Sequence, residues 1–436
     1  MRQGFSFPLP QKKAMKTSVL AGLGALAFLS VAACERMDPD IHIRRSDTLL
    51  REGRPGREGL AGKDSAGAVA IPPDGLFVTA VAYPEGYDWR RDTAHGSVRG
   101  RVLLLRAREK AVFDTLLSLE AGPGKAVSLD PDRHHFVGGH LYTECFTESG
   151  TVYRRDGQTV LRVSEREYVR GILALDGDLY VLSQRLSGEG FLLRKNWKPF
   201  LSYEEGRLYG SLGDLAFGRT GALFEDGGQA CFLYQDPDGG WHLVCGQEDR
   251  TVALPKRVAD VYDIRCFDGT VCLVCRTTGK HAPVLYVGSR KYDLNATVTA
   301  PSQFGGFSLF QYGDEVGFRG SFRLDWNQAL YTGRWTRSRL VESLPGTGFW
   351  LEDGSYVLKQ DGKVVAARHG TVEYSLKEGG SLTMPQCVCL SPEVLYLALT
   401  PTGRGTGTAE RPWLWADGAR TEIGLNGCLT SVTFLQ

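Results

Sequence analysis

The sequence lacks an excess of charge of either sign. Its 436 residues include 51 Lys and Arg against 50 Asp and Glu, a formal net charge of +1 at pH 7. Four of the basic residues and none of the acidic ones precede Cys34, so a chain beginning there would carry 51 minus 4, or 47, basic and 50 acidic residues, a net charge of −3. No overall positive field would attract nucleic acid, and we expect no nucleic-acid partner.

The sequence also lacks the short motifs that name an enzyme or a repeat family. It has no nucleophile elbow, no P-loop and no dinucleotide-binding fingerprint after a strand, and we expect no cofactor. It has no WD dipeptide with a partner Gly-His, no kelch double glycine at a regular spacing and no YWTD run. The stretch QDPDGGW, residues 235–241, resembles the sialidase Asp box only loosely, because an aspartate stands where that motif has glycine.

Long apolar runs are missing except near the start. The run SVLAGLGALAFLSVAA, residues 18–33, follows a leader that contains only basic charges. It is short for a transmembrane helix and has the length of a signal-peptide core. We therefore predict a signal peptide over residues 1–33, a lipid anchor and tether over 34–66, and one folded domain over 67–436. Translation could start at Met1 or at Met15.

The end of this leader resembles the lipobox of bacterial lipoproteins. Small residues at 31–33 precede Cys34, which in that family becomes the lipidated first residue. Several acyl chains would hold the protein stably on a membrane. The acidic residues Glu35, Asp38 and Asp40 are similar to the stretch that directs lipoproteins of Bacteroidota to the cell surface. We expect an outer-membrane lipoprotein, facing either the surface or the periplasm; the alternative is an ordinary signal peptide with a chance cysteine.

What the sequence does contain is a repeated hairpin pattern. The stretch ALDGDLYVLS, residues 174–183, places an Asp-Gly turn between two apolar runs, and relatives begin at Ile71, Arg265 and Trp350. Such a pattern is typical of β-hairpins. Units of this kind start roughly every 40 to 60 residues, the length of a four-stranded unit. The starts lie near Ala68, Ala126, Gly171, Asp214, Val261, Phe307, Phe349 and Cys387.

These units predict an all-β fold, a β-propeller with eight four-stranded blades, or seven if one boundary is misplaced. A closed ring leaves only short strand edges unpaired, and it explains near-continuous apolar strands such as VCLVC, residues 271–275. A tandem of β-sandwiches is the alternative fold. The last strand, GCLTSVTFLQ, residues 427–436, should close the ring, either beside the first unit or beside residues 41–50. The chain thus resembles propeller lipoproteins of Bacteroidota as a broad class.

Two long loops interrupt the period, at residues 84–99 and 400–413. Both should join the second and third strands of their units, and ring closure should make those units neighbours. The loops would then present aromatic rings and guanidinium groups, which stack on sugars or peptides and bind carboxylates. The predicted ligand-binding residues are Tyr87, Trp89, Arg90, Arg91, His95, Arg404, Arg411 and Trp413. The alternatives are a pair of flexible insertions that bind nothing, or a loop that only locks the seam of the ring.

The sequence therefore favours a lipid-anchored binding or scaffold protein for a glycan, a peptide or an envelope protein. The competing hypothesis is a glycoside hydrolase or polysaccharide lyase with carboxylates at the centre of the ring. No catalytic residue can be named from the sequence.

The cysteine and histidine residues offer further candidate sites. Cys231 and Cys245 should face each other across a three-residue hairpin loop, which predicts a disulfide. Nine cysteines follow Cys34, so at least one thiol stays free or bonds another chain. Cys272 and Cys275 should point to opposite faces of one strand. The stretch DPDRHHFVGGH, residues 130–140, is rich in metal-ligand types, but we predict a surface turn on the rim opposite the long loops, and no metal site.

Overall fold

The chain divides into two units, Met1–Pro55 and Gly56–Gln436. The computed structural model describes only part of the second, in the following ranges. They are residues 71–89, 98–108, 112–125, 127–186, 190–209, 222–256, 258, 260–276, 283–293, 305–312, 315–322, 331–337, 339–351, 353–377, 379–382, 387–401 and 411–436. The predicted signal peptide, Cys34 and the tether lie outside the described residues.

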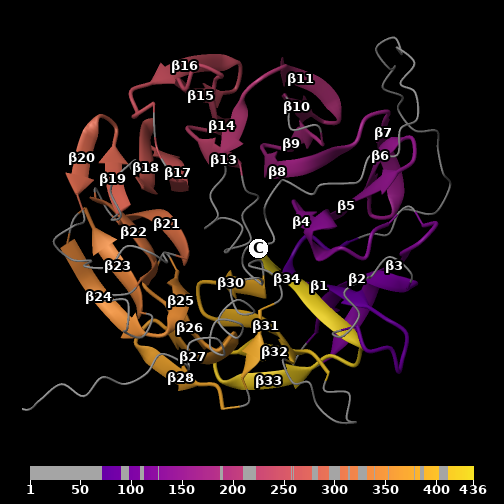
Figure 1. Cartoon of the computed structure of the whole chain (residues 1–436). Coiled ribbons are helices and arrows are strands. Elements are labelled where there is room, and N and C mark those ends of the chain that lie inside the picture. The colour runs from indigo at the N-terminus through magenta and orange to yellow at the C-terminus, as the bar shows by residue number, and fades with distance from the viewer. Residues whose placement is uncertain are drawn as a thin grey trace, which may run out of the picture. The chain divides into compact units, whose positions relative to one another are not determined.

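The described residues form an eight-bladed β-propeller, as the period predicts (Figure 1). Every blade is an antiparallel sheet whose first strand lies nearest the centre of the ring and whose fourth lies at the outside. The alternation of short apolar runs with Gly-containing turns accounts for this architecture, because each run is long enough for one strand and too short for a helix.

The first four blades have these strands, from the centre outward. Blade 1 contains β34 (Gly427–Leu435), β1 (Gly75–Ala82), β2 (Gly100–Ala107) and β3 (Phe113–Ala121). Blade 2 contains β4 (His134–Val137), β5 (His140–Thr147), β6 (Gly150–Arg155) and β7 (Gln158–Val163). Blade 3 contains β8 (Glu167–Leu175), β9 (Asp178–Arg185), β10 (Phe191–Lys195) and β11 (Lys198–Tyr203). In blade 4, β12 (Arg207–Tyr209) and β13 (Leu223–Asp226) both pair with β14 (Gln229–Gln235), followed by β15 (Trp241–Cys245) and β16 (Glu248–Val252).

The remaining blades follow the same order. Blade 5 contains β17 (Asp260–Phe267), β18 (Thr270–Arg276), β19 (Pro283–Val287) and β20 (Arg290–Asp293). Blade 6 contains β21 (Gly305–Tyr312), β22 (Glu315–Phe322), β23 (Tyr331–Thr336) and β24 (Arg339–Pro345). Blade 7 contains β25 (Thr347–Trp350), β26 (Tyr356–Gln360), β27 (Lys363–His369) and β28 (Val372–Ser375). In blade 8, β29 (Gly380–Ser381) and β30 (Val388–Leu390) both pair with β31 (Leu395–Pro401), followed by β32 (Trp413–Ala416) and β33 (Ala419–Glu422).

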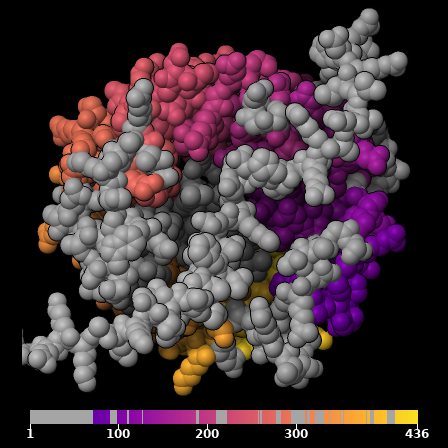
Figure 2. Space-filling model, in the orientation of Figure 1, coloured from indigo at the N-terminus to yellow at the C-terminus, as the bar shows by residue number. Residues whose placement is uncertain are grey.

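Blade 1 closes the ring with strands from both ends of the described chain. β34 pairs with β1 along its length, from Gly75 opposite Leu435 to Ala82 opposite Gly427. Figure 2 shows the indigo N-terminal strands directly beside yellow C-terminal residues. The sequence left two possible partners for the closing strand. The structure shows that it pairs with the first of them, the first unit.

Three of the four Asp-Gly pairs in the repeated hairpins occupy the connection between the first and second strands of a blade. Asp176 (φ 51°) and Gly177 (φ 80°) join β8 to β9, with the positive φ angles that a tight hairpin turn requires. Residues 268–269 and 353–354 occupy the same connection in blades 5 and 7, and residues 74–75 lie at the start of β1, beside the end of β34. We call this side of the ring the turn rim, and the opposite side, with the blade-to-blade connections, the loop rim.

Blades pack face to face, so their strands are buried on both sides. All five residues of 271–275 are at most 3% exposed. Alternate side chains of this strand enter different clusters, because Leu273 packs with Leu233 of blade 4 and Val274 packs with Phe318 of blade 6. The propeller core is therefore a series of layers between neighbouring blades.

One rim assignment made from the sequence is wrong. The Asp130 turn is part of the connection between blades 1 and 2, because residues 131–133 form a 3₁₀ turn and the first strand of blade 2 begins only at His134. The Asp130 carboxylate accepts the backbone N–H of Asp132 (3.1 Å), which favours this turn over an extended strand. The connection also begins at Gly122, beside the Val98 carbonyl at the end of the long loop, so it lies on the loop rim. Within the described part of the chain, no helix has the length and hydropathy needed to cross a membrane.

Candidate functional site

The two long loops of the loop rim meet on either side of one short segment. We call residues 423–426, which connect blade 8 to β34, the seam segment. Both loops join the second and third strands of their blades, as predicted from the sequence. The first loop contacts Asn426, whose side-chain amide donates to the carbonyls of Pro84 (2.6 Å) and Tyr87 (3.0 Å). The second contacts its other end, since Ile423 N–H donates to the Pro412 carbonyl (2.8 Å).

Three aromatic rings gather where the first loop leaves β1. The Trp89 ring stacks on Tyr83 with centroids 5.8 Å apart, and Tyr87 contacts Tyr83 at 5.6 Å. Tyr83 is buried, and burial raises the pKa of its phenol, so it stays protonated. Tyr87 and Trp89 are half-buried against the core of blade 1. They hold the base of the loop in place and leave part of their ring surface exposed.

The described part of the second loop contributes an exposed guanidinium to this surface. Arg411 is exposed, and its Nη1 lies 3.1 Å from the position that a Cβ on residue 424 would occupy. Glycine at 424 therefore leaves room for the Arg411 side chain over the seam segment.

Trp413 does not belong to this exposed surface. It is only 5% exposed and packs in the core between blades 7 and 8, with the Arg420 guanidinium 4.3 Å from its ring centroid. The sequence pattern counted it as a loop residue, whereas it is the first residue of β32. The other predicted ligand-binding residues, Arg90, Arg91, His95 and Arg404, lie outside the described residues, as does Cys34.

A second concentration of polar groups is buried between blades 2 and 3. Glu144 of β5 is 3% exposed and accepts from Arg133 Nη1 (2.6 Å) and from the backbone N–H of Val169 in β8 (3.0 Å). Burial raises the pKa of Glu144 to about 7, although Arg133 opposes this shift. Glu144 therefore holds the two blades together at an electrostatic cost.

Glu167 of β8 forms the other half of this cluster. It accepts from Tyr153 of blade 2 (2.7 Å) and from Ser183 (3.1 Å), and its Oε1 lies 2.7 Å from Nη1 of the fully buried Arg194. Each of the two carboxylates is occupied by an arginine and by further donors. Protein donors thus surround both carboxylates, and neither is open to a substrate.

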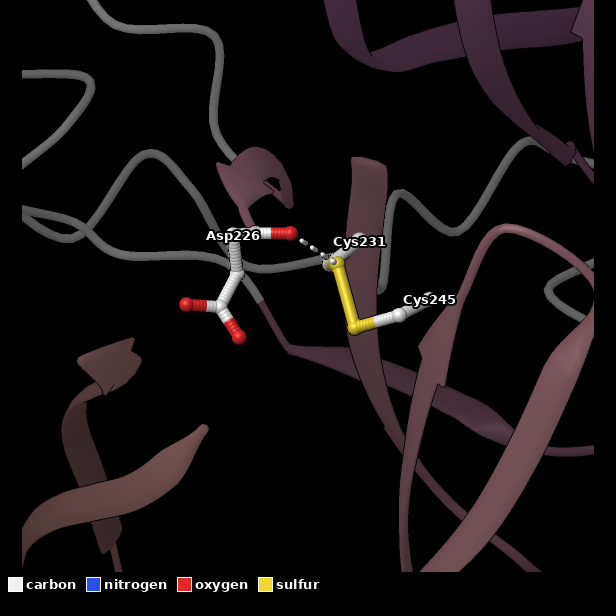
Figure 3. Close-up of side chains that lie close together, drawn as sticks. All are labelled: Asp226, Cys231 and Cys245. Carbon is white, nitrogen blue, oxygen red and sulfur yellow. Dashed lines mark hydrogen bonds between the residues drawn. A yellow bond between two sulfur atoms is a disulfide. The ribbon is translucent and has the colours of Figure 1, made fainter. Parts of the chain in front are cut away.

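The turn rim of blade 4 carries the disulfide predicted from the hairpin register. Cys231 in β14 lies directly opposite Cys245 in β15, with Cα atoms 4.2 Å apart and a bond between their sulfurs (Figure 3). The Asp236 N–H donates to the Gly240 carbonyl (2.9 Å), which leaves the predicted three-residue loop. A polar hollow of about 280 Å³ adjoins the disulfide and is lined by Asp226, Cys245, Glu248 and Arg250, among others.

The described cysteines outside this pair carry free thiols. Cys272 and Cys275 face different inter-blade clusters, as the strand period predicts. Burial raises the pKa of each to about 12, so both remain protonated thiols. Cys266 Sγ donates to Asp226 Oδ2 (3.4 Å), and burial, aided by this carboxylate, raises the pKa of Cys266 to about 12.

The histidines of blade 2 do not converge. His134 begins β4 at the loop rim and His140 begins β5 at the turn rim, where its Nδ1 lies 2.6 Å from Asp156. Burial lowers the pKa of His134 to about 3 and that of His135 to about 4, so both rings stay neutral. Within the described ranges, no three metal-ligand side chains from this stretch come together.

Sequence reasoning missed Tyr83, Asn426 and the buried network. Tyr83 stands at the end of an apolar strand, and Asn426 stands before the last one, so neither position differs from an ordinary turn in the sequence. The glutamates of the network come from strands of two different blades, and only the ring brings them together.

Comparisons with known proteins show the fold alone. No protein-family model matches the chain, and no curated protein is similar to it. Among solved structures, dihydro-heme d1 dehydrogenase NirN, in complex with DHE, is similar over 97% of this chain and 89% of its own, with 10% identity and a TM-score of 0.51. A quinonprotein alcohol dehydrogenase-like protein from Bacteroides thetaiotaomicron is similar over 84% of this chain and 92% of its own, with 12% identity and a TM-score of 0.32. Together with the eight described sheets, the first of these supports an eight-bladed β-propeller.

Proposed function

We propose that this protein is a lipid-anchored propeller of the bacterial outer membrane that binds a ligand at the loop rim, around the seam segment. The main support for this binding surface is that residues 423–426 contact the bases of both long loops. Loops held on a rigid scaffold are where binding residues concentrate. The half-exposed Tyr87 and Trp89 and the exposed Arg411 flank the same segment.

The chemistry of these groups favours a glycan that carries carboxylates. Flat aromatic rings stack on sugar faces, and guanidinium groups bind carboxylates through two parallel hydrogen bonds. The loop arginines 90, 91 and 404 would add to the positive charge of Arg411. A peptide or an envelope protein with an acidic segment presents part of the same chemistry and is a separate outcome of the test.

Affinity electrophoresis through gels that contain polygalacturonate, alginate or hyaluronate tests the proposal. We expect an acidic polysaccharide to retard the wild-type protein, and a neutral dextran gel to leave its mobility unchanged. Arg91→Ala combined with Arg404→Ala, and separately Arg411→Ala, should lose this retardation without a change in melting temperature. Arg290→Ala is the matched control, because Arg290 is an exposed arginine of β20 in a distant blade. Wild-type protein that none of the three acidic polysaccharides retards would refute the glycan proposal.

The seam-lock alternative makes a different prediction for the same variants. Trp89 packs on Tyr83, so Trp89→Ala should lower the melting temperature under either hypothesis. If the loops only lock the ring, the arginine variants should also melt earlier and should move through the acidic gels as the wild type does.

Membrane attachment is proposed through acylation of Cys34. The support is the sequence alone, a signal-like leader that ends in small residues before the cysteine. Cys34→Ser should move the protein from the membrane to the soluble envelope fraction. A Ser variant that still sediments with membranes would contradict lipidation.

The hydrolase or lyase alternative gains no support from the described residues. Glu144 and Glu167 are buried and occupied by arginines, and no group of three carboxylates lies together within the described ranges. We therefore do not propose a catalytic function.

A further inference from the structure

The end of blade 4 at the turn rim has neighbours that a purely structural disulfide does not need. Cys231 is buried, but Cys245 is partly exposed and lines the polar hollow. Figure 3 shows Asp226 beside the two sulfurs, at the end of β13. The Asp226 carboxylate and both sulfurs lie within 4.8 Å of one another. A disulfide that a reductant can reach is the reducible kind, unlike one buried in a core.

Reduction would leave the two sulfurs close together. Cys231 and Cys245 are directly opposed in adjacent strands, and the same antiparallel register continues through four further residue pairs to Gln235–Trp241. Two thiolates bound to one tetrahedral zinc ion, each at about 2.3 Å, lie about 3.8 Å apart. That separation is available to opposed side chains on neighbouring strands.

The third ligand is already oriented. Asp226 Oδ1 accepts the Gly269 N–H and Oδ2 accepts the Cys266 thiol, both at 3.4 Å, so blade 5 holds the carboxylate in one orientation, with an oxygen within 4.8 Å of both sulfurs. Groups that hydrogen-bond to a metal-ligating side chain raise metal affinity. Thiolate and carboxylate together suit Zn²⁺, and the hollow provides an entry path and room for a water as fourth ligand.

We propose that reduction of the Cys231–Cys245 disulfide creates a zinc site formed by Cys231, Cys245 and Asp226. The site would release its metal again when the disulfide re-forms. It is independent of the ligand surface on the loop rim, because it lies at the opposite rim and three blades away.

A dithiol can supply the two electrons that reduction of the Cys231–Cys245 disulfide requires. One thiolate of the dithiol attacks the accessible sulfur of Cys245, forms a mixed disulfide and releases Cys231 as a thiolate. The second thiol of the reductant then attacks that mixed disulfide, releases Cys245 and leaves as the oxidised disulfide, so two electrons and two protons pass to the protein. Zn²⁺ binding displaces the two thiol protons to solvent.

The test compares oxidised and reduced full-length protein. Both are freed of metal, and the reduced form is separated from dithiothreitol by gel filtration without oxygen. Each is then titrated with Zn²⁺ against a chromogenic chelator, and with Co²⁺ while thiolate-to-metal absorption is recorded. We expect one tightly bound Zn²⁺ and a thiolate–Co²⁺ absorption band in the reduced protein, and neither in the oxidised protein.

Substitutions separate this site from the remaining thiols. The double variant Cys231→Ser, Cys245→Ser should bind no Zn²⁺ after reduction, and Asp226→Asn should weaken binding at least about tenfold while it leaves the disulfide intact. Cys389→Ser is the matched control, since Cys389 is a partly exposed free thiol of blade 8, and this variant should bind as the wild type does. Equal Zn²⁺ binding by the oxidised protein or by the double serine variant would overturn the proposal, as would no binding by the reduced wild type with its secondary structure retained.

Discussion

At the scale of single residues, the environment of Glu144 changes the pKa of its carboxyl group. It is buried between blades 2 and 3 and takes hydrogen bonds from Arg133 and from the backbone of β8. Burial disfavours its charge by more than these partners favour it, so the pKa of Glu144 rises from 4.5 to about 7. The folded protein therefore holds a proton here that the unfolded chain releases.

This pKa predicts how stability changes with pH. Between pH 4.5 and 7 the folded state binds the proton more tightly than the unfolded state, so the contribution of Glu144 to the free energy of unfolding falls as pH rises through this window. Glu144→Gln, which resembles the protonated form, should remove that part of the slope. The expected change across the window is on the order of 2 to 3 kcal/mol, at about 1.4 kcal/mol per pKa unit.

Urea unfolding of the wild type and the variant at a series of pH values measures this difference. His134 and His135, whose pKa values are lowered, affect stability in the opposite direction, because burial of their neutral rings becomes costly as pH falls below 6.5. Both proteins share that effect, so the difference between their curves isolates Glu144. Glu165→Gln, at an exposed glutamate, should leave the slope unchanged. Parallel curves for Glu144→Gln and the wild type would contradict the expectation.

At the scale of elements, the closing strand depends on three buried hydroxyls. Thr79 of β1 forms hydrogen bonds with Thr430 (2.7 Å) and Ser431 (2.6 Å) of β34, where the register shifts by one residue. All three side chains are buried. The sheet that joins the two ends of the chain is thus tied by side chains as well as by its backbone ladder.

Thr79→Val should weaken this closure. The substitution keeps the shape but leaves two buried hydroxyls without their partner, at a cost of about 1 to 3 kcal/mol. Thr143→Val is the matched control, because Thr143 is buried in β5 and its hydroxyl has no hydrogen-bond partner among the described residues. It should be neutral or stabilising. Thermal unfolding measures the stability of both variants. An equal fall in melting temperature in both would mean that the hydroxyl contacts at β34 contribute nothing to stability.

Local sequence patterns predicted most strands, because the residues that specify a strand and the turn after it are neighbours in the sequence. The four strands of blades 3 and 7 follow from alternating apolar runs between Gly-containing turns. In blades 4 and 8, two short strands stand where the other blades have one first strand. The sequence could not predict this, because each short strand is defined only by its pairing with the second strand of the blade. The rim of the Asp130 turn was misassigned because the apolar residues Val127 and Leu129 before it resemble a first strand, whereas the first strand of blade 2 begins only at His134. Trp413 was misassigned because its burial depends on packing between blades.

At the scale of the whole molecule, the ring is closed by a blade that both ends of the chain share. Seven blades are each made from one continuous stretch of chain, and only blade 1 combines β34 with β1, β2 and β3. Neighbouring blades contact each other mainly through packed side chains, as the inter-blade clusters show. Opening the ring between two continuous blades separates packed faces and breaks single side-chain hydrogen bonds such as those of Glu144 and Glu167, whereas opening it at blade 1 breaks the backbone ladder between β1 and β34.

Two circular permutants of residues 71–436 test this reasoning. Both join residue 436 to residue 71 through a short linker, which turns β34 and β1 into an ordinary hairpin. The first places new termini in the turn at residues 176–177, so blade 3 becomes the shared blade, and the second places them in the connection at residues 204–206, so no blade is shared. The second should open beside its new termini at a lower free-energy cost, by at least about 2 kcal/mol, because in the first a few ladder hydrogen bonds of about 1 kcal/mol each must break before the ring opens. Its amides beside the new termini should also exchange hydrogen faster than the same amides in the first, because partial opening of the ring no longer requires a ladder to break. Equal exchange rates beside the new termini of the two permutants would show that the ladder adds nothing to blade packing in holding the ring closed.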